Sequence, residues 1–77
     1  MDLIKLFRGI DGMPKAALDA FRKNCSAKFV AEKIIAPHTE RMSKNAGMEM
    51  DPLYVAYLLE FVVQNSPQSA SHGQKNN

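Results

Sequence analysis

The segment from Asp51 to Val63 constrains this 77-residue chain more than any other. Between Leu53 and Val63 every residue except Glu60 is apolar or a tyrosine. Such a dense apolar stretch is not stable when it is fully exposed to water. Other helices or a second copy of the chain must therefore cover it. It is shorter than the roughly 20 residues that a membrane-spanning helix needs. The remaining chain, or a second copy of the whole chain, must therefore supply a surface that packs against this segment.

Local signals predict that this segment is a helix. Asp51 is a good N-cap residue, and Pro52 suits the first helical position because its missing N–H has no partner there anyway. The β-branched and aromatic residues at 54–55 and 61–63 would also suit a strand. No other segment offers a partner strand, so we expect a helix over 52–64.

Two shorter helices are expected earlier in the chain. Asp2 can cap a first helix that runs through Arg8, and Gly9 favours the end of the helix there. A second helix begins at Pro14 and ends near Asn24. Its apolar face lies roughly 120° away from the apolar face of the residues that follow. A single straight helix would expose one of the two faces, so we place a break before Ser26, a good N-cap residue.

The third helix is predicted over residues 26–45 with a kink at Pro37. Proline removes one backbone donor and clashes with the preceding turn, which costs about 3 kcal/mol inside a helix. The apolar phase nevertheless continues beyond Pro37, which favours a kinked helix over the alternative, a true break at Ala36. Gly47 then suits the C-terminal cap.

Together these elements predict an all-α domain, a small bundle of three to four short helices formed by residues 1–65. From Ser66 the composition changes to serine, glutamine, asparagine and glycine, with no apolar residue beyond Ala70. We therefore expect residues 66–77 to be a disordered polar tail.

The composition argues against several kinds of site. One cysteine, Cys25, allows no disulfide within the chain, and together with His38 and His72 it is too little for a structural zinc site. A cytoplasmic protein without metal, cofactor or enzymatic activity is expected. The phase of the third helix places His38 between Ile34 and Met42, where either a partly buried, hydrogen-bonded histidine or a pH-sensitive group would fit.

The width of the apolar face on the 52–64 helix points to an interface. It covers about 200° of the circumference, whereas one neighbouring helix covers about 100°. A narrow polar edge is expected at Glu60 and Gln64, on the side of Ala56 and Leu53. Either the short helices of the bundle wrap the whole face, or part of it binds another protein. The residues predicted for such an interface are Tyr54, Leu58, Phe61 and Val62.

These features favour a small non-enzymatic regulatory or adaptor protein that binds other proteins, as a homodimer joined through the 52–64 helix. The alternative is a nucleic-acid-binding regulator that resembles a helix-turn-helix in its 14–45 hairpin. The net charge of +2 is too small to indicate nucleic acid by itself. The bases that this alternative would use are Arg22, Lys23, Lys28 and Lys33.

Overall fold

Residues 2–65, which are those that the computed structural model describes, form helices and short connections with no strand among them. The prediction of an all-α fold is confirmed. The tail predicted at 66–77 lies outside the described residues. In chain order the elements are α1 (Leu3–Leu6), α2 (Met13–Arg22), α3 (Ala27–Val30), the π-helical η1 (Ala31–Ile35), the 3₁₀-helical η2 (Ala36–His38), α4 (Thr39–Ala46) and α5 (Pro52–Gln64).

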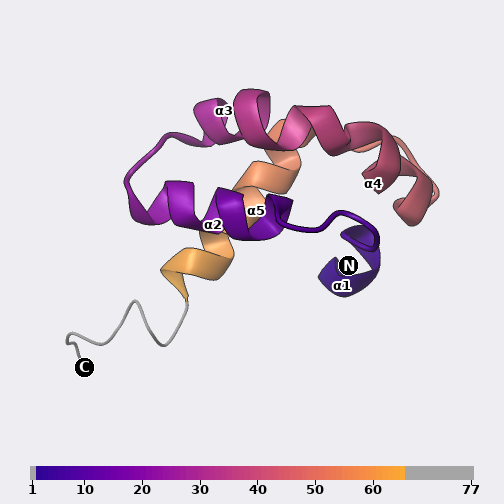
Figure 1. Ribbon diagram of the computed structural model, residues 1–77, viewed down its shortest axis with the longest axis horizontal. Coiled ribbons are helices and arrows are strands. Elements are labelled where there is room, and N and C mark those ends of the chain that lie inside the picture. The colour runs from indigo at the N-terminus through magenta and orange to yellow at the C-terminus, as the bar shows by residue number, and fades with distance from the viewer. Residues whose placement is uncertain (1, 66–77) are drawn as a thin grey trace.

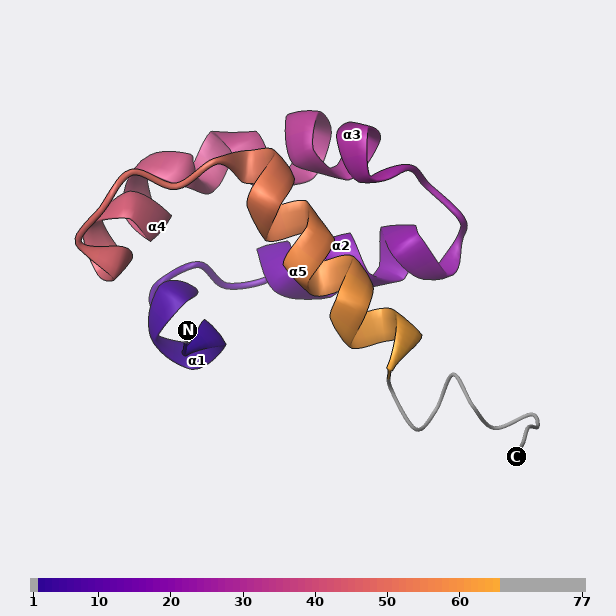
Figure 2. The ribbon, with the colours of Figure 1, turned by 180° about the vertical axis from the view of Figure 1, so that it is seen from behind.

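Helix α5 packs against elements from two earlier parts of the chain. It packs against α2, α3 and η1. At the other end of the molecule α1 packs on α4 (Figure 1). In the view from behind, α5 crosses over α2 and is the element nearest the viewer (Figure 2). One long side of α5 therefore faces the other helices, and the opposite side faces outward.

The predicted N-terminal caps are confirmed by side-chain hydrogen bonds. The carboxylate of Asp2 accepts hydrogen bonds from the first turn of α1. The hydroxyl of Ser26 accepts from the backbone N–H of Phe29 at 3.1 Å. The carboxylate of Asp51 accepts from the N–H of Leu53 at 2.9 Å. Each cap satisfies a backbone donor that has no partner within its own helix.

Two helices end earlier than the sequence suggested. Helix α1 ends at Leu6, because the N–H of Arg8 bonds to the carbonyl of Lys5 and tightens the last turn. Helix α2 ends at Arg22, and Asn24 adopts a left-handed backbone with φ 68°. Asparagine tolerates this conformation better than most residues, so the predicted break between the second and third helices is confirmed.

Residues 27–46 form one continuous helical segment, which confirms the kinked helix rather than a break at Ala36. The change at Pro37 is made by two irregular turns. In the first, the N–H of Ala36 bonds to the carbonyl of Ala31, five residues earlier, as in a π-helix. A 3₁₀ turn follows, and α-helical geometry resumes at Thr39. Gly47 caps the segment at φ 72°, as predicted.

The π turn changes which side chains reach the core. Val30 and Ile35 are both fully buried, and they are five residues apart, the repeat of a π turn. His38 is partly buried, as the sequence predicted, and Ile34 is partly buried against the core, whereas Met42 is fully buried. Ile35, rather than Ile34, is the isoleucine that reaches the core.

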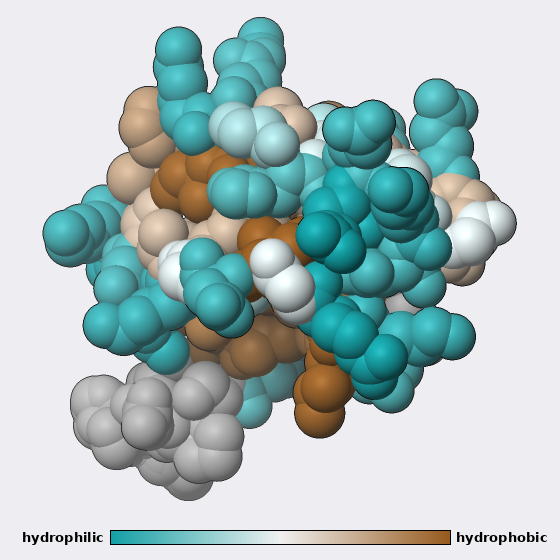
Figure 3. All heavy atoms as spheres, turned by 45° about the vertical axis from the view of Figure 1, so that its right-hand side comes forward, coloured by the Kyte–Doolittle hydropathy of each residue, from teal (hydrophilic) through white to brown (hydrophobic). Residues whose placement is uncertain are grey.

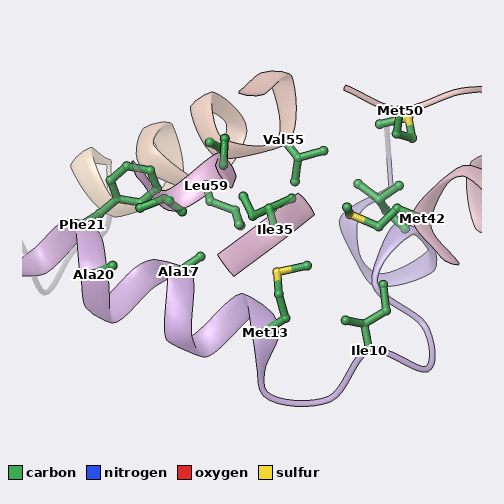
Figure 4. Close-up of a cluster of buried hydrophobic side chains, with 14 residues drawn as sticks. Ile10, Met13, Ala17, Ala20, Phe21, Ile35, Met42, Met50, Val55 and Leu59 are labelled. Carbon is green, nitrogen blue, oxygen red and sulfur yellow. The ribbon is translucent and has the colours of Figure 1, made fainter. Parts of the chain in front are cut away.

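One cluster of apolar side chains connects the whole described chain. Figure 4 shows Phe21 and Leu59 toward one end of this cluster, with Ile10 and Met42 toward the other. No polar or charged side chain within residues 2–65 is buried. The buried members are Leu6, Ile10, Met13, Ala17, Ala20, Phe21, Val30, Ala31, Ile35, Met42, Met50, Val55, Ala56 and Leu59.

Candidate functional site

The side of α5 that faces away from the core is apolar and aromatic. Tyr54 is 49% exposed, Tyr57 55%, Phe61 65% and Val62 39%, and Leu58 is half-buried between them. In the view from behind, no other helix lies in front of α5 (Figure 2). We call it the outer face of α5, and it consists of Tyr54, Tyr57, Leu58, Phe61, Val62 and the exposed C-cap residue Asn65.

The opposite side of α5 belongs to the core. Val55, Ala56 and Leu59 are buried there, at the spacing of one helical face. The predicted polar edge is wrong in one respect, because Ala56 was placed on it and is fully buried. The helix α2, which packs against α5, also buries two alanines, Ala17 and Ala20. Small side chains at a helix crossing allow the two backbones to approach closely, which explains the inward position of Ala56.

Of the four residues predicted for an interface, Tyr54, Phe61 and Val62 are exposed and Leu58 is half-buried. They lie on one face, so the sequence identified most of the exposed apolar surface of α5. Tyr57 was missed, because it was assigned to the flank of the polar edge. The regular spacing of the exposed positions, with Asn65 at their C-terminal end, was the sequence signal that could have added Tyr57 to the predicted interface.

The exposed apolar area of this face is large for so short a chain. Taking about 200 Å² for a whole aromatic side chain, the exposed fractions of its aromatic residues and Val62 amount to roughly 400 Å². Contiguous apolar patches of this size on a monomer are often binding sites. By contrast, hydrophilic side chains dominate the face drawn in Figure 3, with apolar ones between them.

No charged residue lies on the outer face of α5. The helix carries no acidic side chain in its first turn after the cap and no basic one in its last turn. Beside its N-terminal half lies a groove of about 410 Å³, which shares Tyr57 with the outer face. Lys28 and Glu32 line one wall of this groove, and Asp51 lies at the start of α5. The groove therefore brings together charges of both signs around an apolar floor.

The four bases proposed for nucleic-acid contact are all exposed. Arg22 forms an ion pair with Asp19, at 3.2 Å. Lys28 lies in the groove together with Glu32 and the Asp51 carboxylate. Acidic groups beside these two bases lower the positive potential that a phosphate backbone would meet.

The two residues with the most reactive side chains have no common site. Cys25 is a free, half-buried cysteine between α2 and α3, and His38 lies half-buried in η2. Within residues 2–65 no group of three or more histidine, cysteine or acidic side chains is placed to hold a metal ion. In the same range no helix is both long and apolar enough to cross a membrane.

No family model matches the chain, and no curated protein or solved structure shows significant similarity to it.

Proposed function

We propose that this chain is a small, cytoplasmic, non-enzymatic regulatory or adaptor protein that binds other proteins and forms a homodimer through the outer face of α5. One observation carries the proposal: three aromatic side chains, each about half exposed or more, stand together on a helix whose opposite side is core. Scattered exposed apolar residues are ordinary, whereas a contiguous group indicates a surface that is covered in the working state.

The chemistry of the face suits a protein partner better than nucleic acid. Aromatic side chains are enriched in the centres of protein interfaces, and charged residues are depleted there. The outer face of α5 has this composition, with two tyrosines, one phenylalanine and no charge. Binding to nucleic acid through Arg22, Lys23, Lys28 and Lys33 is the alternative. A gel shift on random duplex over a salt series tests it, because binding through phosphates weakens steeply as salt rises.

Sedimentation equilibrium of the whole chain from micromolar to millimolar concentrations tests the homodimer. We expect a dimer for the wild type and a monomer for Phe61→Asp, which places a charge on the most exposed aromatic position of the face. Phe29→Asp is the matched control, because Phe29 is 46% exposed but lies on α3, outside this face. A dimer that survives Phe61→Asp, or a wild type that stays monomeric up to millimolar concentration, would contradict the proposed interface.

Binding to other proteins is tested by affinity capture from the native cell with three baits, the wild type, Phe61→Asp and Phe29→Asp. Proteins that bind through the outer face of α5 should be recovered with the wild type and with Phe29→Asp but lost with Phe61→Asp. Circular dichroism of the three baits establishes that each is equally helical. Equal recovery by all three baits would place any partner elsewhere on the molecule.

A further inference from the structure

We propose that α5 pairs with α5 of a second copy in antiparallel orientation, with Leu58 level with Phe61 of the second copy and Tyr54 level with its Asn65. The inference rests on the proposed homodimer and specifies its geometry. The register follows from the order of the residues on the exposed face, the orientation from the partial charges at the two ends of α5, and the strength of the pair from the area exposed.

The outer face of α5 has the same spacing from either end. Its six positions follow one another at intervals of three, one, three, one and three residues. In a two-fold antiparallel pair each residue meets the one at the mirrored position of the other helix. With the two-fold axis between Leu59 and Glu60, each position of the face meets another position of the face, so no core residue is needed in the contact. The mirrored pairs are Tyr54 with Asn65, Tyr57 with Val62, and Leu58 with Phe61.

The centre of the face has the spacing of a two-helix seam. Tyr54, Leu58, Phe61 and Asn65 follow at intervals of four, three and four residues, the alternation that keeps one stripe facing a partner helix. A single polar residue in such a seam fixes the register. Asn65 is that residue here. Its Nδ2 donates to the carbonyl of Phe61 within its own helix, and the proposed register brings its side chain level with the hydroxyl of Tyr54.

The ends of α5 favour the antiparallel orientation over a parallel one. A helix carries partial positive charge at its N-terminus and partial negative charge at its C-terminus. No basic side chain offsets the C-terminal end of α5. Antiparallel pairing brings that end beside the N-terminal end of the second copy, where Lys28 is accompanied by Glu32 and Asp51, so the orientation is favoured by the helix dipole rather than by a side-chain charge. Parallel pairing would instead place like ends together.

The exposed area indicates that the pair is weak and exchanges. Roughly 400 Å² from each copy gives an interface of about 800 Å² in total, below the ~1,200 to 2,000 Å² of stable complexes. Small interfaces of this kind are typical of transient association. The dimer should therefore dissociate on dilution.

Complementary charges test the register. Leu58→Lys and Phe61→Glu should each give a monomer in sedimentation equilibrium, and their equimolar mixture should give a heterodimer at least about tenfold tighter than either homodimer. The control mixture is Tyr54→Lys with Tyr54→Glu, whose charges meet in a parallel pair but lie about 16 Å apart along the helix axis in the antiparallel register. Because Leu58 is half-buried, a second pair at exposed positions repeats the test, Tyr54→Lys with Asn65→Glu.

The outcomes separate the register from the proposed homodimer. Recovery of association in the 58/61 or the 54/65 mixture supports the antiparallel register. Recovery in the 54/54 mixture, or in no mixture although the wild type is a dimer, overturns the register and leaves the homodimer standing. A wild type that is monomeric up to millimolar concentration overturns both.

Discussion

The side-chain amide of Asn45 donates a hydrogen bond of 2.8 Å to the carbonyl oxygen of Leu6, 39 residues earlier in the chain. The same nitrogen lies 3.0 Å from the carbonyl oxygen of Arg8. Leu6 is the last residue of α1 and Arg8 lies two residues beyond it, in the region where the carbonyl oxygens at a helix end have no partner within the helix. A helix of four residues does not form alone, so α1 depends on this attachment to α4 as well as on the burial of Leu6.

Replacing Asn45 by alanine should therefore destabilise the protein and release α1. Two hydrogen bonds of about 0.5 to 1.5 kcal/mol each are lost, so we expect the free energy of unfolding to fall by about 1 to 3 kcal/mol. Urea unfolding followed by circular dichroism measures the loss, and limited proteolysis should cleave near residues 3–8 sooner than in the wild type. Lys44→Ala, at the exposed neighbouring position, is the control and should change neither quantity.

Asp51 should contribute to stability through its cap on α5. Asp51→Ala removes the acceptor of the Leu53 N–H and should cost about 1 kcal/mol. Asp51→Asn keeps an acceptor at the same place and should stay within a few tenths of a kcal/mol of the wild type. Urea midpoints of the three proteins, compared at one low concentration, test this. Equal losses for alanine and asparagine would mean that the carboxylate charge, rather than the cap hydrogen bond, matters.

Substitutions of Gly47 measure the cost in stability of a left-handed backbone at a non-glycine residue. Gly47 has φ 72°, and a Cβ added there would meet no atom within 4 Å, so substitution adds strain without a clash. Gly47→Ala should cost about 1 kcal/mol, and Gly47→Asn less, because asparagine adopts this conformation more readily. Thermal unfolding of both variants gives the comparison. A loss in Gly47→Asn as large as that in Gly47→Ala would show that the backbone conformation is not the cause.

Substitutions at two adjacent positions test which side of α5 faces the core. Ala56 is fully buried and Tyr57 is exposed. Ala56→Leu should destabilise by about 1 to 3 kcal/mol, because the core has no room for the added carbons. Tyr57→Leu should stay within about 0.5 kcal/mol. Urea unfolding of the two variants checks the assignment, and the reversed order would mean that α5 presents a different side to the core.

The features that local chemistry decides were predictable from the sequence. Asp51 and Ser26 supply the oxygens for their own helix starts, and Gly47 supplies the conformation that ends α4, so neighbouring residues alone determine these boundaries. The same local information located the break at Asn24. Most of the exposed residues on α5 were also named in advance, because no short helix could cover so wide an apolar surface.

Features that depend on packing were not predictable. Ile34 and Ile35 are chemically identical, so nothing in the sequence shows that Ile35 is the one that reaches the core. Helix α5 is apolar on nearly every side, which leaves its rotation undetermined until α2 is placed against it. In the observed orientation Ala56 is fully buried, on the side of α5 that faces the core.

The π turn at η1 takes up one residue more than an α-helical turn between Val30 and Ile35, which both reach the core. Removing one residue there would return the segment to α-helical geometry, in which residues four apart share a face, so the residues after it would keep their direction. Met42 would stay in the core, and the Asn45 amide would still reach the carbonyls of Leu6 and Arg8. A single-residue deletion at η1 would thus straighten the segment and leave α1 attached.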